Sequence, residues 1–295
     1  QNIVDSLKTP QNSLEGLLSE IGTITRGNHL IADLKQLGGN IGGVSLQIND
    51  DPAIPLSKPR KKTDQHYNFQ QNNTKNKRQK DNIAAVELVR QYNAGEITLD
   101  SITDEQKDIL GRYTGNGGNL LDVETGMRGS DYEYYTPKPI ASGIWDVLND
   151  MGFGGGKVLD PCAGVGIFGA TAPINAAIDA VELDKTSGTI NKLINESDSY
   201  NVRVSNFESV ASRTPDESYD AIVANVPFGS NRGRNFKYDE KYQKASLEYY
   251  FIMRSLEKLK GGGLAAFLVP DRCMTGKSSK ERALRQDSSL LGEFL

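Results

Sequence analysis

Residues 158–169 read VLDPCAGVGIFG, and this stretch decides the fold. An apolar strand runs directly into a glycine-rich turn, and the turn opens a helix. In an open parallel sheet a ligand binds just beyond the carboxyl ends of the strands, where such a turn lies. Gly164 and Gly166 have no side chain, so the backbone can approach a ligand closely there. The stretch therefore predicts the first strand of a doubly wound sheet together with its ligand-binding loop.

The acidic residues around this loop indicate which ligand it takes. Residues 164–169 match the G-x-G-x-x-G pattern, which by itself suggests a dinucleotide. Asp160 stands at the strand tip, where a carboxylate repels a pyrophosphate and suits a cationic amino group. Glu182 ends the next expected strand, where its two oxygens can accept hydrogen bonds from both ribose hydroxyls. S-adenosylmethionine has that ammonium group and no phosphate. We therefore expect a pocket for this methyl donor, with a nicotinamide or flavin site as the alternative.

The chain around the loop alternates between helices and short apolar strands from about residue 134. Strands are expected over 157–160, 178–182, 202–206, 219–225 and 264–269. Helices are expected over 139–151, 166–172, 187–194, 247–259 and 278–290. Upstream, residues 82–95 have helical spacing, and Thr103 has the character of an N-cap. The alternation is typical of an α/β fold with a doubly wound, mostly parallel, Rossmann-like sheet covered on both faces.

The fourth expected strand ends in Asn225-Val-Pro-Phe228. This segment resembles the Asn-Pro-Pro-Tyr/Phe signature of methyltransferases that act on amino groups attached to flat π-systems. Asn225, Pro227 and Phe228 match the signature, and they are our candidate catalytic residues. Val226 stands where proline is commoner, which keeps the carbonyl group but is expected to loosen the turn. The alternative is an ordinary turn between a strand and a loop.

The chemistry of an exocyclic amine explains why these residue types are needed. Such a nitrogen is a poor nucleophile because its lone pair is delocalised into the ring. The side-chain oxygen of Asn225 and the carbonyl group of residue 226 can both accept hydrogen bonds from the NH2 group. Phe228 can stack on the base for roughly 1–3 kcal/mol, which offsets part of the cost of extruding a base from a duplex. Transfer is then an in-line displacement that depends on positioning.

Further segments resemble the donor site of adenine methyltransferases. Tyr135, Thr136 and Pro137 match the Tyr-Thr-Pro segment that these enzymes place over the methionine end of the donor. By residue type alone, the prolines here only mark a helix start. Asn206 and Phe207, at the end of the third strand, are expected at the adenine ring of the donor, with a plain strand end as the alternative. The loop residues assigned to the same pocket are Pro161, Ala163, Gly164, Gly166 and Phe168, whereas Cys162 is expected to be a small packing residue.

Two basic segments are candidate contacts to DNA. Residues 58–80 are polar and basic and include Tyr67 and Phe69 as stacking groups, although a solvated linker has the same composition. Arg232, Arg234 and Lys237 lie in the loop after the catalytic turn, and a solvated surface loop is again the alternative. The net charge of −4 says little, because local patches set phosphate affinity.

Composition excludes several other classes of protein. Two cysteines and two histidines, scattered along the chain, are too few for a zinc site or a disulfide framework, so no metal is expected. No apolar run reaches the roughly 18–20 residues that span a bilayer, and no signal peptide opens the chain. We therefore expect a soluble, intracellular protein; the resemblance described next implies the bacterial cytoplasm, with packaging in a phage virion as the alternative.

The order of the motifs resembles that of the gamma-type N6-adenine DNA methyltransferases. Residues 82–86, 103–106 and 113–118 (NIAAV, TDEQ and YTGNGG) also resemble the region that precedes the methylase domain of large methylase–helicase proteins of phages and mobile elements, including defence-against-restriction proteins. This resemblance covers about residues 66–295. It implies methylation of adenine N6 in DNA, which protects phage or mobile-element DNA from restriction.

The resemblance also sets the expected domains. These are an appendage of unknown role at 1–57, a basic linker or arm at 58–80, a helical lead-in at 81–130 and the methyltransferase core at 131–295. The core shows five strands where this fold normally has seven, so its last hairpin is expected beyond Leu295. Other acceptors, namely cytosine N4, an RNA base or a protein glutamine, and a non-catalytic binding or virion module, are the alternatives.

Overall fold

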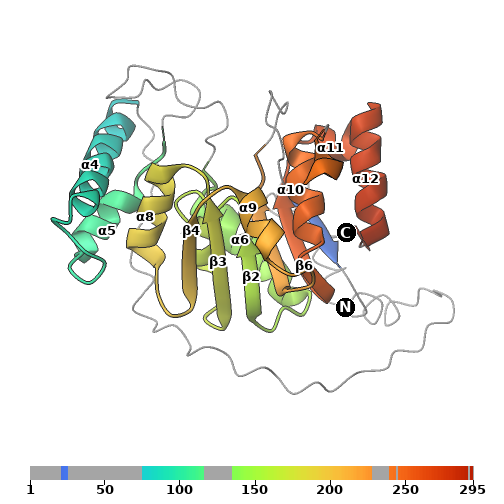
Figure 1. Cartoon of the computed structure of the whole chain (residues 1–295), viewed down its shortest axis with the longest axis horizontal. Coiled ribbons are helices and arrows are strands. Elements are labelled where there is room, and N and C mark those ends of the chain that lie inside the picture. The colour runs from blue at the N-terminus through green and yellow to red at the C-terminus, as the bar shows by residue number, and fades with distance from the viewer. Residues whose placement is uncertain are drawn as a thin grey trace.

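The computed structural model describes residues 21–25, 75–115, 135–227, 239–243, 245–291 and 293–294. Within these ranges the strands form one sheet in the order β4-β3-β2-β5-β6-β1-β7, with helices on both faces (Figure 1). The predicted α/β fold with a doubly wound, mostly parallel sheet is therefore confirmed. No helix in the described ranges has both the length and the apolar character needed to cross a membrane.

Five parallel strands make up the core of the sheet. Each pairs in parallel with its neighbours, and short apolar strands of this kind need cover on both faces. All five coincide with the strands expected from the sequence to within a few residues: β2 (Gly156–Asp160), β3 (Ala176–Glu182), β4 (Tyr200–Val204), β5 (Tyr219–Asn225) and β6 (Leu259–Leu268).

Successive residues of the strands point to opposite faces and so build two cores. Leu159 and Val181 pack with α9 (Phe207–Arg213) and α10 (Leu247–Leu256) on one face. Val158 and Ile178 pack with α6 (Lys138–Asp150) and α7 (Ile167–Thr171) on the other. Trp145 of α6 is 2% exposed and donates its indole N–H to the carbonyl oxygen of Phe168 in α7 over 2.7 Å. Helix α7, which directly follows the glycine-rich loop, is thereby tied to α6.

The order of the strands fixes where the ligand site lies. After β2 the chain moves outward to β3 and β4, and it then returns to add β5 on the other side of β2. The carboxyl ends of β2 and β5 are therefore neighbours at a topological switch point, where ligands of open α/β sheets bind. The two motifs that the sequence analysis singled out, at 158–169 and 225–228, follow these two strands.

The lead-in packs as a helical pair beside α8 (Lys185–Asn195), at the β4 edge of the sheet (Figure 1). It consists of α4 (Lys75–Asn93) and α5 (Asp104–Gly111). The predicted N-cap is confirmed: the Thr103 hydroxyl accepts from Gln106 N, and the Gln106 side chain accepts from Thr103 N. Helix α4 begins inside the basic segment 58–80, because its lysine, arginine and glutamine residues are good helix formers.

Two short strands extend the sheet beyond the five that were expected. Strand β1 (Ile21–Thr25) pairs antiparallel with β6, and β7 (Glu293–Phe294) pairs antiparallel with β1. The sequence analysis indicated no strand in the segment that supplies β1. Nearby, α11 (Arg272–Thr275) and α12 (Ser279–Leu291) follow β6, and α12 covers the predicted range 278–290 closely.

Two boundaries differ from expectation for identifiable reasons. Strand β4 ends at Val204, and Asn206 is the N-cap of α9, a short helix that was not expected. Strand β6 starts at Leu259, five residues early, and its pairing with β5 is irregular between Tyr219 and Ala221. The glycines at 261–263 accommodate this irregularity, and Gly262 adopts a φ of 83°.

Candidate active site

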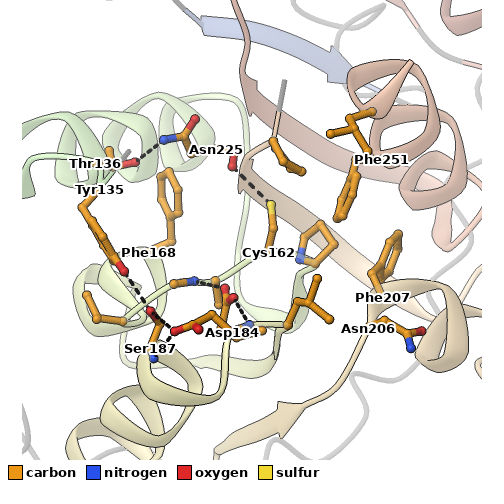
Figure 2. A pocket seen from close by; sticks show the side chains of 18 of the residues that line it. Tyr135, Thr136, Cys162, Phe168, Asp184, Ser187, Asn206, Phe207, Asn225 and Phe251 are labelled. Carbon is orange, nitrogen blue, oxygen red and sulfur yellow. Dashed lines mark hydrogen bonds between the residues drawn. The ribbon is translucent and has the colours of Figure 1, made fainter. Parts of the chain in front are cut away.

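A cavity of about 830 Å³ opens at the carboxyl ends of β2, β3, β4 and β5. Its size suits a nucleoside-sized ligand. The loop after β2 lines one half together with Tyr135, and the aromatic side chains of α9 and α10 line the other (Figure 2). The sequence-assigned residues that line it are Tyr135, Thr136, Pro161, Ala163, Gly164, Phe168, Glu182, Asn206, Phe207, Asn225 and Pro227. Pro137 and Gly166 are described but do not line it.

Three buried side chains hold the glycine-rich loop from behind. Asn191 Nδ2 donates to Gly164 O over 3.3 Å, and Asn195 Nδ2 donates to Val165 O over 3.3 Å. The hydroxyl group of Tyr200 donates to Gly166 O over 3.5 Å. All three side chains are at least nine-tenths buried. Three successive carbonyl groups thus face the protein interior, which fixes the path of the loop along the cavity wall.

The two glycines of the loop are needed for different reasons. Gly164 has a φ of 54°, and a β-carbon there would lie 3.2 Å from the ring of Tyr135, on the cavity side. Gly166 has a φ of 88°, and a β-carbon there would collide with Asn191, Asn195 and Tyr200. Gly166 was expected to let a ligand approach the backbone. In the structure, its lack of a side chain instead leaves room for the three side chains that hold the loop.

Glu182 lies at the end of β3 with both carboxylate oxygens already hydrogen bonded. Oε2 accepts from Gly164 N and Oε1 accepts from Asp184 N, both over 2.7 Å. Burial raises the pKa of Glu182 above its usual value. Each oxygen of a carboxylate can accept a further hydrogen bond. The side chain can therefore tie the donor loop to β3 and still accept from two ligand hydroxyls in the cavity.

Asp160 lies behind the loop and does not line the cavity. Its side chain is fully buried, and Oδ1 accepts from Cys162 N over 3.4 Å. Oδ2 has no hydrogen-bond partner among the described residues. Burial raises the pKa of Asp160 well above its usual value, and the charge of Glu182 adds to this. Direct contact with a ligand ammonium group thus remains a prediction, and it would require the loop to move.

A chain of hydroxyl groups joins Tyr135 to the start of α8. Tyr135 Oη lies 2.8 Å from Ser187 Oγ, and Ser187 Oγ donates to Asp184 Oδ1 over 2.8 Å. Asp184 is also the N-cap of α8, where Oδ1 accepts from Ser187 N over 2.7 Å. The ring of Tyr135 is therefore fixed at its hydroxyl end and lies over Gly164.

Asn225 is held at both its side chain and its backbone. Nδ2 donates to Thr136 Oγ1 over 3.3 Å, which turns Oδ1 to the other side (Figure 2). The carbonyl oxygen of Asn225 accepts from Cys162 Sγ over 3.2 Å. Burial raises the pKa of the Cys162 thiol well above its usual value, so it remains a neutral donor. Cys162, expected to be only a packing residue, thus links the loops that follow β2 and β5.

Val226, in the turn after β5, makes a backbone hydrogen bond that a proline could not make. Val226 N donates to Leu268 O of β6 over 3.3 Å, and its side chain is 1% exposed within the core. A proline at this position would have no N–H group. The expected loosening of the turn is therefore offset by this hydrogen bond and by the burial of the valine side chain.

Aromatic side chains form the opposite half of the cavity. Phe207 and Phe251 stack with their ring centroids 5.4 Å apart and their planes at 23°. Asn206, beside them, uses Oδ1 to accept from Ser209 N over 2.7 Å. Phe251 and Leu183 also line the cavity and were not expected from the sequence. Leu183 is 53% exposed. Phe251 has the spacing of an ordinary core residue of α10, so the sequence gives no sign that it lines the cavity. Leu183 could have been identified, because it directly follows Glu182.

Some candidate residues lie outside the described part of the chain. These are Phe228, Arg232, Arg234, Lys237 and most of the basic segment 58–80, including Tyr67 and Phe69. Among the residues that the structure does describe, no cluster of histidine, cysteine or acidic side chains could hold a metal ion.

Comparison with known proteins identifies the family of the chain. The model of the family described as N-6 DNA Methylase matches residues 120–289. Defense against restriction protein B of Escherichia phage P1 is 38% identical over 219 residues. The matched region is 74% of this chain but only 9% of the length of that relative.

Solved structures show weaker similarity. One is a Listeria monocytogenes protein assigned as a class I S-adenosylmethionine-dependent methyltransferase, with 16% identity, a TM-score of 0.47 and coverage of 68% of this chain and 64% of that one. Another is assigned as a modification subunit of a type I restriction enzyme of Vibrio vulnificus, with 20% identity, a TM-score of 0.42 and coverage of 54% and 38%. Both TM-scores are low, so the family assignment rests on the sequence match.

Proposed function

The chain belongs to the N-6 DNA methylase family, and from this premise we propose that it transfers a methyl group from S-adenosylmethionine to the N6 amino group of adenine in DNA. The observation that carries the proposal is the position of Asn225. It lies at the switch point of the sheet and lines the same cavity as the glycine-rich loop. A donor in the cavity and an acceptor amine at Asn225 would then meet without a further conformational step in the core.

The residues around the cavity fit S-adenosylmethionine in three parts. Glu182 offers acceptor oxygens for the two ribose hydroxyls. Phe207, Phe251 and Leu183 offer apolar surface for the adenine ring, next to the side chain of Asn206. Tyr135 and the loop at 161–168 border the space left for the methionine end. Asp160 lies buried behind the loop, and burial favours its neutral form. We propose that a donor ammonium group on the cavity side of the loop would favour the ionised carboxylate, because a nearby positive charge stabilises it.

The donor supplies an electrophilic methyl group on a sulfonium ion, and the chain supplies the positioning. Asn225 Oδ1 is turned away from Thr136 and can accept a hydrogen bond from the target NH2 group. The carbonyl group of Val226 can accept the second. Two acceptors favour a pyramidal nitrogen and direct its lone pair at the methyl carbon, while Phe228 stacks on the base. No covalent intermediate with the protein is needed.

DNA is the proposed partner. Arg232, Arg234, Lys237 and the basic segment 58–80 are the proposed contacts to its phosphates. The phage P1 relative is named as a defence against restriction, so we propose that methylation of phage or mobile-element DNA blocks restriction nucleases. We propose that the protein carries out this role in the bacterial cytoplasm, or is packaged in a phage particle.

Transfer of a labelled methyl group tests the proposal. The purified protein is incubated with labelled S-adenosylmethionine and unmethylated DNA, and the DNA is then digested to nucleosides. We expect the label in N6-methyladenine and none with Asn225→Ala. Label in N4-methylcytosine would correct the acceptor. Donor binding without label in DNA would refute the proposal and point to RNA, a protein glutamine or a non-catalytic role.

A further inference from the structure

We propose that the helical lead-in positions Tyr135 in the donor pocket, with Asn82 and Tyr113 as the positioning residues. The inference rests on the proposed function, since it assigns Tyr135 to the methionine end of the donor. It concerns two sequence segments, at 82–86 and 113–118, that the methyl transfer itself leaves without a role. The structure brings the described part of the second segment against Tyr135.

Asn82 is a buried side chain that serves a distant turn. It is 3% exposed in α4. Its Nδ2 donates to Gly115 O over 2.6 Å, and its Oδ1 accepts from Thr114 N over 3.0 Å. A buried amide is costly unless both of its polar ends are paired, and here the turn pairs both. The side chain therefore fixes the backbone at 114–115, more than thirty residues along the chain.

The fixed turn determines where the ring of Tyr113 lies. Tyr113 is 6% exposed and belongs to the cluster that joins Leu110 to Val165 and Ile190 of the core. Its ring meets the ring of Tyr135 edge to face, with centroids 6.1 Å apart and planes at 81°. This is a favourable arrangement for two aromatic rings. Tyr113 thus supports Tyr135 from the side of the lead-in.

Tyr135 carries the effect into the cavity. Its hydroxyl group is hydrogen bonded to Ser187, its ring lies over Gly164, and it lines the cavity beside the donor loop (Figure 2). The ring is therefore positioned from three sides, by Tyr113, Gly164 and Ser187. Phe207 and Phe251 lie in the opposite half. Displacing Tyr113 should consequently disturb the methionine end of the donor and leave the adenosine end as it is.

Calorimetric titration with two ligands distinguishes effects on the methionine end of the donor site from effects on the adenosine end. S-adenosylhomocysteine has the amino-acid portion of the donor, and 5′-methylthioadenosine lacks it. We expect Tyr113→Leu to lower the affinity for S-adenosylhomocysteine by roughly two- to twelvefold, the size of one edge-to-face contact. The affinity for 5′-methylthioadenosine should stay unchanged. Tyr113→Phe keeps the ring and should bind both ligands nearly as the wild type does, and Asn82→Ala should follow Tyr113→Leu.

A control for general loss of stability comes from the same helical pair. Leu88→Ala removes a buried side chain of α4, so it should lower the melting temperature without selective loss of S-adenosylhomocysteine. The inference is overturned if Tyr113→Leu binds that ligand as the wild type does. Equal weakening of both ligands, or an equal selective loss in Leu88→Ala, would overturn it as well. Wild-type protein that binds neither ligand would instead refute the proposed donor site itself.

Discussion

Removing the hydroxyl group of Thr136 tests whether the orientation of the Asn225 amide limits methyl transfer. Asn225 Nδ2 donates to Thr136 Oγ1 over 3.3 Å, and Thr136 is 7% exposed. Thr136→Val keeps the branched shape and removes this acceptor. Without it, the amide can exchange its oxygen and nitrogen, and the exchanged form presents a donor to the target amine.

The size of the effect follows from the worth of one hydrogen bond. A net contribution of about 0.5–1.5 kcal/mol corresponds to roughly two- to tenfold in rate, since about 1.4 kcal/mol is a factor of ten. We therefore expect the single-turnover rate constant of transfer in Thr136→Val to fall by that factor. Thr136→Ser keeps the oxygen atom and is the matched control, with an expected rate constant close to that of the wild type.

The assay is single-turnover transfer from labelled S-adenosylmethionine at saturating donor and DNA, with the affinity for S-adenosylhomocysteine measured in parallel. Thr136 also lines the cavity, so a loss of donor affinity alone is the competing outcome. A wild-type transfer rate in Thr136→Val, with only weaker donor binding, would show that Thr136 is a donor ligand and would refute the orientation argument.

Other perturbations address the remaining parts of the site. Asn225→Ala should abolish transfer and spare donor binding, because its side chain is proposed to bind the acceptor amine and not the donor; an equal loss of both contradicts that role. Gly166→Ala should lower the melting temperature and donor affinity together, since the added carbon would collide with Asn191. Gly154→Ala, at a position surrounded by open space, is its control. Equal melting temperatures for the two variants would contradict the explanation that Gly166 is needed for packing. Donor affinity should fall on acidification at a higher pH than for an ordinary glutamate, because burial raises the pKa of Glu182 and its ionised form is proposed to accept hydrogen bonds from two donor hydroxyls. Glu182→Gln should flatten this profile, and an unchanged profile would implicate Asp160.

The sheet could be predicted because its strands are apolar runs bounded by turns. Strand β5 was predicted with its full extent, Tyr219–Asn225, and the glycine-rich loop identified the strand before it. Local signals of this kind lie within a few residues of the feature they predict. The capping box at Thr103 and Gln106 belongs to the same class, and it too is present in the structure.

Contacts between distant segments could not be predicted in the same way. The bond between Thr136 and Asn225 joins residues 89 positions apart. The reason for Gly166 depends on side chains from α8 and β4, which no local pattern reveals. Asn206 was placed at a strand end because an N-cap and a strand end share the same extended backbone, and only the helix that follows distinguishes them. The assigned site residues themselves remain predictions until they are tested.

The link between Trp145 and Phe168 gives the protein a built-in optical probe. Trp145 is the only tryptophan of the chain. Its indole N–H is bonded to the backbone of Phe168, whose side chain lines the cavity. Indole emission responds to its hydrogen bonding, so a ligand that shifts the loop would change the fluorescence of a single chromophore. Association and release of the donor could then be followed in real time by stopped-flow mixing, without dye, isotope or DNA.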